Sequence, residues 1–317
     1  MRTTRLILNT LTMAIVILAA ASLSQAQATR TFVSGVGNDA DPCSRTAPCR
    51  TWSGALIKTF INGEIDALDP GGYGTLNITK SVTIDGGTGS GWGSTLASGT
   101  TGFTVNIAVN ANDPLRQVFL KHLSINGTGP TGAVGTRTGT NGINYIQGSS
   151  LTIEKCQIFN FTTTGILVNL TNNGTLKVSD TSISSIGGDG IRMTTTVGQV
   201  TAAIENVDIR DCGSDGIEVG NRVRAAIRDT VLTHSAIVGI RSNGTDNFLN
   251  IDDVFVSYST TGLQASAGST FRVSDSMITQ NATGLNANGG TMVSLQGNSV
   301  AGNTVDGLPF TSTTLKQ

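Results

Sequence analysis

Two stretches of the chain, GGDGIRM (187–193) and GSDGIEVG (213–220), carry one pattern 26 residues apart. In each, an Asp precedes a Gly and an Ile, and a charged residue comes next. One such stretch alone could hold the acid of an enzyme. A pattern that returns at a regular period indicates a repeated structural unit.

The dipeptide Gly-Ile or Gly-Leu recurs at intervals of 22 to 26 residues through the second half of the chain. It begins at Gly142, Gly165, Gly190, Gly216, Gly239, Gly262, Gly284 and Gly307. Each unit also contains a stretch of alternating apolar and polar residues, such as LKVSDTSI (176–183) and AAIENVDI (202–209). Alternation with period two is typical of a strand with one buried face.

Units of this length, rich in Thr, Gly and β-branched residues, are too short to hold a crossover helix. The sequence therefore predicts an all-β parallel β-helix, a solenoid of roughly 22–26-residue coils stacked about 4.8 Å apart. Two aliphatic stacks are expected in its core. The first runs from Ile143 to Leu308, and the second consists of Ile158, Ile183, Ile209, Leu232, Val256, Ile278 and Val300.

A turn position within each unit is occupied mostly by residues that tolerate tight or left-handed turns. Its members are Lys155, Asp180, Asn206, Asp229, Asp253, Asp275 and Gly297. These side chains are interpreted as structural.

The first 28 residues have the form of a signal peptide. They have a cationic start, an apolar stretch shorter than a membrane span and an Ala-Gln-Ala cleavage signal. Cleavage would remove Arg2 and Arg5 from the 20 Lys and Arg, and the remaining 18 would face 21 acidic residues. We therefore expect a secreted or periplasmic protein without a membrane span, and this mild acidity argues against a nucleic-acid partner.

The region after the signal peptide divides into two parts. Residues 29–68 are predicted to hold a strand, a disulfide loop and a helix that caps the solenoid, with Thr51 as N-cap and Gly63 as the stop. The helix would place Trp52, Ala55, Leu56 and Phe60 on one face. Residues 69–317 would form the β-helix, with loops extruded near 86–102 and 126–141.

Four cysteines in an exported chain suggest disulfides. Cys43 and Cys49 flank a short Pro-bounded loop and are the plausible pair. Cys156 and Cys212 fall at different points of the repeat and are interpreted as buried free thiols in preference to a second bridge. The chain has two histidines, neither near a cysteine pair, so no metal or other cofactor is expected.

The segment DPGGYGTLNITKSVTIDG (69–86), together with the Gly-Ile repeats, resembles exported bacterial proteins of the pectin lyase-like superfamily. This resemblance covers nearly the whole chain after residue 28, and it implies a right-handed β-helix. It does not extend to a characterised enzyme family. The "GGDGI" and "GSDGI" strands resemble one polygalacturonase motif, but the paired-aspartate strand, the Gly-His-Gly turn and the Arg-x-Lys of those enzymes are absent.

The residue two positions after each repeat Gly should point away from the core. Arg192, Glu218 and Arg241 would then form a ladder on three consecutive coils, with Glu218 facing solvent. In enzymes of the resembled superfamily the equivalent strand lies under the substrate. Arg192, Glu218 and Arg241 are therefore candidate ligand-binding residues, as is Trp92 in the first loop.

Two functions remain open from the sequence. The first is a non-catalytic structural, adhesive or polysaccharide-interacting role for the outward strand face, with an extracellular or cell-wall polysaccharide as partner. The alternative is a polysaccharide lyase or glycoside hydrolase for acidic glycans, with Asp189, Asp215 and Glu218 as candidate catalytic residues. Ordinary turn chemistry also accounts for an Asp that precedes a Gly.

Overall fold

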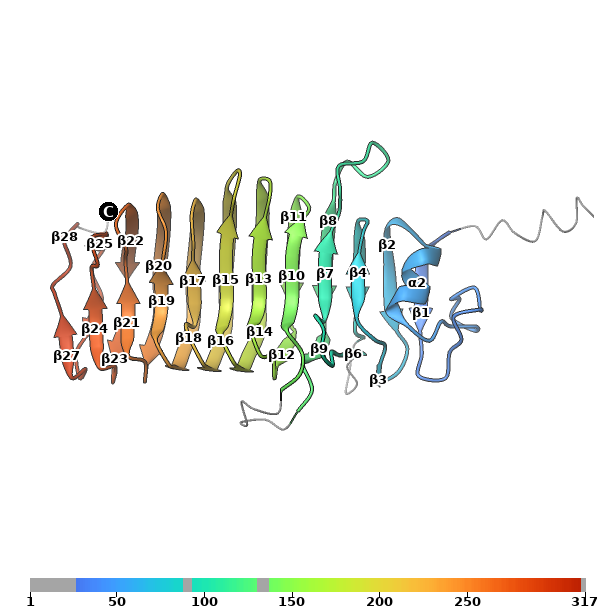
Figure 1. Ribbon diagram of the computed structural model, residues 1–317, viewed down its shortest axis with the longest axis horizontal. Helices are drawn as coiled ribbons and strands as arrows, with labels where there is room; N and C mark the ends of the chain where they lie inside the picture. The colour runs from blue at the N-terminus through green and yellow to red at the C-terminus, as the bar shows by residue number, and fades with distance from the viewer. Residues whose placement is uncertain (1–26, 88–92, 130–136, 315–317) are drawn as a thin grey trace, which may run out of the picture.

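The computed structural model describes residues 27–87, 93–129 and 137–314, which wind into one elongated solenoid (Figure 1). The coils stack in chain order along its long axis, and neighbouring strands pair in parallel. The fold is the right-handed parallel β-helix that the repeat and the resemblance predicted. The segment predicted as a signal peptide, apart from residues 27 and 28, and Trp92 lie outside the described residues.

Two sheets line the solenoid in the described part of the chain. The small sheet contains β4 (Leu76–Ile78), β7 (Phe103–Asn106), β10 (Asn141–Gln147), β13 (Thr164–Leu170), β15 (Asp189–Thr195), β17 (Ile217–Val219), β19 (Val238–Ser242), β21 (Thr261–Gln264), β24 (Thr283–Asn286) and β27 (Val305–Gly307). The large sheet contains β1 (Ala28–Val33), β2 (Thr59–Ala67), β3 (Gly71–Gly72), β5 (Val82–Asp85), β6 (Gly93–Leu96), β8 (Gln117–Lys121), β9 (Leu123–Asn126), β11 (Ser150–Glu154), β12 (Gln157–Phe159), β14 (Gly174–Ile186), β16 (Val200–Cys212), β18 (Val223–Ser235), β20 (Asn247–Ser257), β22 (Ser269–Ser274), β23 (Met277–Thr279), β25 (Thr291–Ser294), β26 (Ser299–Val300) and β28 (Ser312–Thr313).

Each central coil crosses the small sheet once and the large sheet twice, with a bend between its two large-sheet segments. The bend residue has a left-handed backbone in coil after coil, with φ between 47° and 71° at Lys155, Asp180, Asn206, Asp229, Asp253, Asp275 and Gly297. The predicted turn column is confirmed. Asp and Asn tolerate this backbone because their short side chains can hydrogen-bond to nearby backbone. Side chains in this column also bond from coil to coil, since Asn206 Nδ2 donates to Asp180 Oδ1 at 2.6 Å.

The repeat glycine is required by the approach of the next coil. A Cβ added to Gly190 would lie 2.6 Å from the carbonyl oxygen of Gly216, and one on Gly216 would lie 2.7 Å from that of Gly239. Gly102 belongs to the same column, since its Cβ would lie 2.5 Å from the Gly142 oxygen. The series of Gly-Ile and Gly-Leu dipeptides does not include Gly102, because Phe103 follows it and 40 residues separate it from Gly142.

The two aliphatic stacks are present, with one correction at the last coil. Ile143 to Leu285 pair in register on the small sheet, and Ile158 to Val300 do so on the large sheet. Leu308 is not in the first stack, because Gly307 pairs with Leu285 and leaves Leu308 68% exposed. The last Gly-Leu dipeptide is therefore one residue out of phase with the others.

A short helix, α2 (Trp52–Lys58), lies at the N-terminal end of the solenoid (Figure 1). Thr51 is its N-cap, as predicted, and accepts a hydrogen bond from the Gly54 amide at 3.0 Å. The predicted stop at Gly63 is wrong. Thr59 already has an extended backbone, and the helix ends at Lys58. Residues 59–67 form strand β2 instead, because they pair with both β1 and β5. Phe60 is consequently exposed instead of packed beneath the helix.

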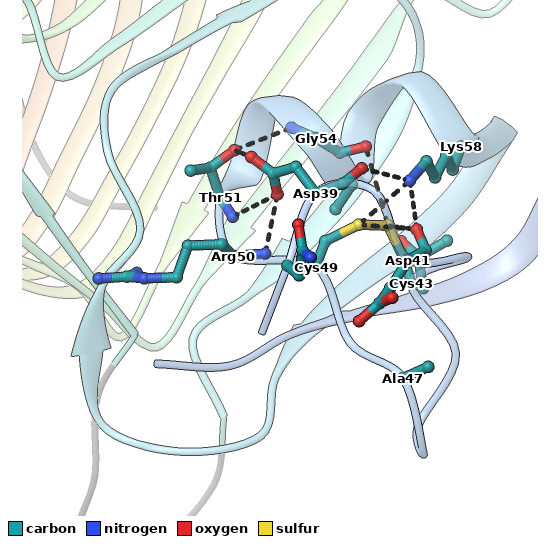
Figure 2. Close-up of a disulfide and its surroundings, with 12 residues drawn as sticks. Asp39, Asp41, Cys43, Ala47, Cys49, Arg50, Thr51, Gly54 and Lys58 are labelled. Atoms are coloured by element: carbon teal, nitrogen blue, oxygen red, sulfur yellow. Dashed lines mark hydrogen bonds between the residues drawn. A yellow bond between two sulfur atoms is a disulfide. The ribbon is translucent and has the colours of Figure 1, made fainter. Parts of the chain in front are cut away.

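The loop before α2 is closed by the predicted Cys43–Cys49 disulfide (Figure 2). Asp39 accepts hydrogen bonds from the Arg50 amide and from the Thr51 amide and hydroxyl at 2.8–2.9 Å, so it ties this loop to the start of the helix. Burial alone would raise the pKa of Asp39, but these hydrogen bonds outweigh it and lower the pKa. Lys58 Nζ donates to the Asp39 carbonyl oxygen at 2.6 Å from the last turn.

Cys156 and Cys212 are buried and free, as the sequence predicted. Burial raises the pKa of each thiol to about 12.

Loops leave the solenoid at several turns. Within the loop expected near 86–102, residues 93–96 form strand β6. A further loop, residues 107–116, projects beside β8 (Figure 1) and was not predicted. Across the described residues, no helix has both the length and the apolar character needed to cross a bilayer.

Candidate functional site

The predicted ladder lies on the outward face of the small sheet. Register pairs join Arg192 of β15 to Glu218 of β17, and Glu218 to Arg241 of β19. The same outward column continues through Asn144, Leu167, Gln264 and Asn286. The strand period of two turns all of these side chains away from the core.

Two aspartates lie at the edge of this ladder and connect one coil to the next. Asp189 Oδ1 accepts from the Asp215 amide at 3.1 Å, and Asp215 Oδ1 accepts from the Val238 amide at 3.0 Å. Both aspartates are buried, and Asp215 is completely inaccessible. Each carboxylate therefore satisfies a buried backbone donor of the following coil.

The arginines pair unequally with these acids. Arg241 Nε lies 2.7 Å from Asp215 Oδ2, and Arg241 Nη2 lies 3.4 Å from Glu218 Oε2. Arg192 is more distant, with Nη1 4.0 Å from Asp189 Oδ2 and Nη2 3.8 Å from Glu218 Oε1. Side-chain exposure is 48% for Arg192 and 21% for Arg241.

Glu218 is not the solvent-facing residue that the sequence suggested. Its side chain points away from the core but is only 5% exposed, since it lies between the two guanidinium groups. Asn243 Nδ2 donates to its Oε1 at 3.1 Å. Within the ladder, Arg192 therefore carries most of the exposed charge.

Burial also changes the protonation of the two aspartates. It raises the pKa of Asp215 to about 7; the Arg241 charge opposes this shift, and the Asp189 and Glu218 carboxylates add to it. Burial likewise raises the pKa of Asp189, although a hydrogen bond from Ser214 opposes it. Burial therefore favours the protonated form of both aspartates, and it does so against the charge of the neighbouring arginines.

Sequence reasoning did not identify Asn243 or Ser214 as members of this site. Asn243 follows Arg241 by two residues and so shares its outward face, a signal that the strand period contains. Ser214 precedes Asp215 in the turn, and nothing in its sequence context distinguishes it from other turn serines.

Two groups of described acids are close enough to offer ligands to a cation. Asp189, Asp215 and Glu218 each have an oxygen within 4.8 Å of the others, as do Glu64, Asp66 and Asp85. In the first group Arg241 and Arg192 already supply positive charge, and in the second Arg30 pairs with Asp66. Calcium takes six to eight oxygen ligands. Neutralisation of the carboxylates by the neighbouring arginines is therefore the simpler explanation for both groups of acids.

Comparisons with known proteins agree with the fold. A family model described as "Right handed beta helix region" matches residues 189–315, which is less than half of the chain. Among solved structures, the chain is similar to that of pectate lyase Pel9A, with a TM-score of 0.54 and 14% sequence identity. The match covers 86% of this chain and 70% of that one. No curated protein sequence matches significantly.

Proposed function

We propose that this protein is a secreted or periplasmic, non-catalytic β-helix whose small-sheet face interacts with an acidic polysaccharide. Its partner is an extracellular or cell-wall glycan, held across several coils by the ladder of Arg192, Glu218 and Arg241. The similarity to a pectate lyase structure supports the carbohydrate class only through the shared fold.

This proposal rests on the exposure and the weak ion pairing of Arg192. Its guanidinium group is half exposed, and its two ion pairs, at 3.8 and 4.0 Å, are long. A guanidinium group can bind a carboxylate or sulfate through two parallel hydrogen bonds. Because the acids beneath it are buried, a ligand that approaches this face meets positive charge and neutral amides.

Apart from Leu167, which pairs with Arg192, the remainder of the outward column is polar and suits an extended polar ligand. Asn144, Gln264 and Asn286 offer amide donors and acceptors on coils to either side of the arginines. Asn144 Oδ1 is buried and has no hydrogen-bond partner among the described residues. Gln264 and Asn286 follow Arg241 on the next two coils at a spacing of about 4.8 Å, which allows one chain to contact all three.

Retention of acidic and neutral polysaccharides by the purified protein tests the proposal. We expect binding to an acidic polysaccharide, with about tenfold weaker affinity after Arg192→Gln, the effect of one lost charge-assisted contact. Arg210→Gln is the matched control, because Arg210 is 49% exposed and pairs with Asp208 away from this face. Absence of retention on every polysaccharide, or equal losses in both variants, would refute the proposal.

One observation favours the alternative, a glycoside hydrolase or polysaccharide lyase. The pKa of Asp215 near 7 is suitable for a general acid or base at neutral pH. Its complete burial argues against this role, since a sugar cannot reach its oxygens without displacement of Arg241. New reducing ends or unsaturated uronates that disappear in Asp215→Asn would establish the alternative.

A further inference from the structure

A pocket lies beside the loop 107–116, on the large-sheet side of the coil turns. Its volume is about 450 Å³, and it opens to solvent. Residues from three successive coils line it together with the last residue of the loop: Arg116, Ser149, Asn173, Thr175, Gln199 and Thr201. It therefore lies on a different face from the ladder on the small sheet.

Arg116 is fixed in place by the next coil. Its carbonyl oxygen accepts from the Ser149 amide at 2.9 Å, and its φ of 45° lies in the left-handed region. That backbone is unfavourable for an Arg relative to the ordinary helical region. The position thus holds a cationic side chain where Gly or Asn would be easier to accommodate.

The guanidinium group of Arg116 has no partner among the described residues. It makes no hydrogen bond and no ion pair there, and its Nη1 is buried. The nearby carboxylate, Asp113, is already occupied by the Ser81 amide and hydroxyl at 2.6 and 2.5 Å and by the Arg116 amide at 3.1 Å. A partly buried cation without a counter-ion is costly, and an oxyanion would remove that cost.

The rest of the lining is neutral and able to hydrogen-bond. The hydroxyl groups of Ser149, Thr175 and Thr201 and the side-chain amide of Gln199 form no hydrogen bonds within the described residues, whereas the Gln199 backbone amide donates to Asn173 Oδ1 at 2.9 Å. Among the residues that line the pocket, none carries a negative charge. The pocket thus combines one unpaired cation with several free donors.

Tyr145 lies beneath the pocket and is not among the residues that line it. It is fully buried, and its hydroxyl, which is also shielded from solvent, has no partner within the described part of the chain. A Cβ on Gly174, which does line the pocket, would lie 3.1 Å from Tyr145 Oη, so the hydroxyl lies directly behind this glycine. Burial raises the pKa of Tyr145, and the positive charge of Arg116 opposes this shift.

We propose that this pocket binds one oxyanion group, a carboxylate, sulfate or phosphate, through the Arg116 guanidinium and the surrounding hydroxyls. The group belongs either to a small free anion or to an anionic sugar. The site shares no residue with the ladder of Arg192, Glu218 and Arg241. A negative result for the proposed function would therefore leave this proposal unaffected.

Titration of the isotope-labelled protein with sodium sulfate at constant ionic strength tests this site. We expect saturable shifts of the Ser149, Thr175 and Gln199 backbone amides. Arg116→Gln should weaken the apparent Kd at least tenfold, by roughly the loss of one charge-assisted contact, and Arg210→Gln should leave it unchanged. Sodium acetate, methyl glucuronide and neutral methyl glucoside then identify the source: binding of all the anions indicates a free-anion site, and preference for the glucuronide indicates a sugar-borne group.

A stability measurement separates a ligand site from a structural arginine. Without added anion, Arg116→Gln should melt at the same temperature as the unmodified protein or higher, because it removes an unpaired cation. Shifts that never saturate with any anion, saturable shifts that survive Arg116→Gln, or a lower melting temperature of that variant would each overturn the proposal. If Arg116→Gln does not fold, Arg116→Met, which also removes the charge and keeps an aliphatic side chain, replaces it in both comparisons.

Discussion

Arg241 Nε lies 2.7 Å from Asp215 Oδ2, and the Asp215 side chain is completely buried. Removal of the cation would leave a buried carboxylate with only the Val238 amide as donor. We expect Arg241→Gln to lower the free energy of unfolding at pH 8 by about 3 kcal/mol. Chemical denaturation measures this loss.

The control for this prediction is Arg192→Gln in the same ladder. Arg192 is half exposed and its ion pairs are long, so its loss should change the free energy of unfolding by less than about 0.5 kcal/mol. If both variants lose the same stability, the close Arg241–Asp215 pair has no special role.

The raised pKa of Asp215 predicts a pH dependence of unusual sign for an aspartate. The folded protein retains a proton on this group up to about pH 7, whereas the unfolded chain releases it near pH 4. The contribution of Asp215 to stability is therefore complete below pH 4 and is lost as the pH rises through 7. Relative to Asp215→Asn, the unmodified protein should lose about 2.5 kcal/mol between pH 5 and pH 8. Denaturant melts at several pH values measure the free energy of unfolding of both proteins. If the two free energies change with pH in parallel, the assignment to Asp215 is wrong.

Gly216 should tolerate no side chain. A Cβ there would lie 2.7 Å from both the Gly239 oxygen and Leu232 Cδ2, so Gly216→Ala should cost about 2–3 kcal/mol. Gly72→Ala is the matched control, because the nearest atoms to its Cβ are 3.6 Å away. Thermal melts should show a clear loss for Gly216→Ala and no loss for Gly72→Ala.

Thiol labelling should separate the two kinds of cysteine. Cys156 and Cys212 are buried with the pKa of each raised to about 12, so neither should react with a thiol reagent in the folded protein at pH 8. Without reductant, unfolding should expose two reactive thiols, and reduction of Cys43–Cys49 should raise this number to four. Labelling of the folded protein before unfolding would indicate that Cys156 or Cys212 is accessible.

The period of the glycines made the fold predictable from the sequence. Glycine is required wherever a carbonyl oxygen of the next coil would lie within 2.7 Å of a Cβ. The spacing of the glycines from Gly142 to Gly284 is therefore the length of one coil. The signal fails where that spacing is interrupted, at Gly102, and where the last coil shifts phase, at Leu308. The end of α2 was missed because pairing of β2 with two other strands depends on residues far away in the sequence.

The charged members of the candidate site were predictable from the sequence, but Asn243, Ser214 and the burial of the acids were not. Strand alternation placed Arg192, Glu218 and Arg241 on one face, but it could not show that two arginine side chains cover Glu218. Arg116 left no periodic signal, since it ends a loop that occurs once. Its significance depends on what surrounds it in space, where Asp113 already has other partners.

The glycine column also limits how a protein of this design can change its length. A segment inserted between two coils must bring its own glycine and a full circuit of the solenoid, or it would break the register between the neighbours that it separates. Insertions of a few residues fit only at the turns, as the loop 107–116 does, where the chain leaves the stack and returns without disturbing it. Growth along the axis is therefore by whole coils, while new binding surfaces arise at the turns.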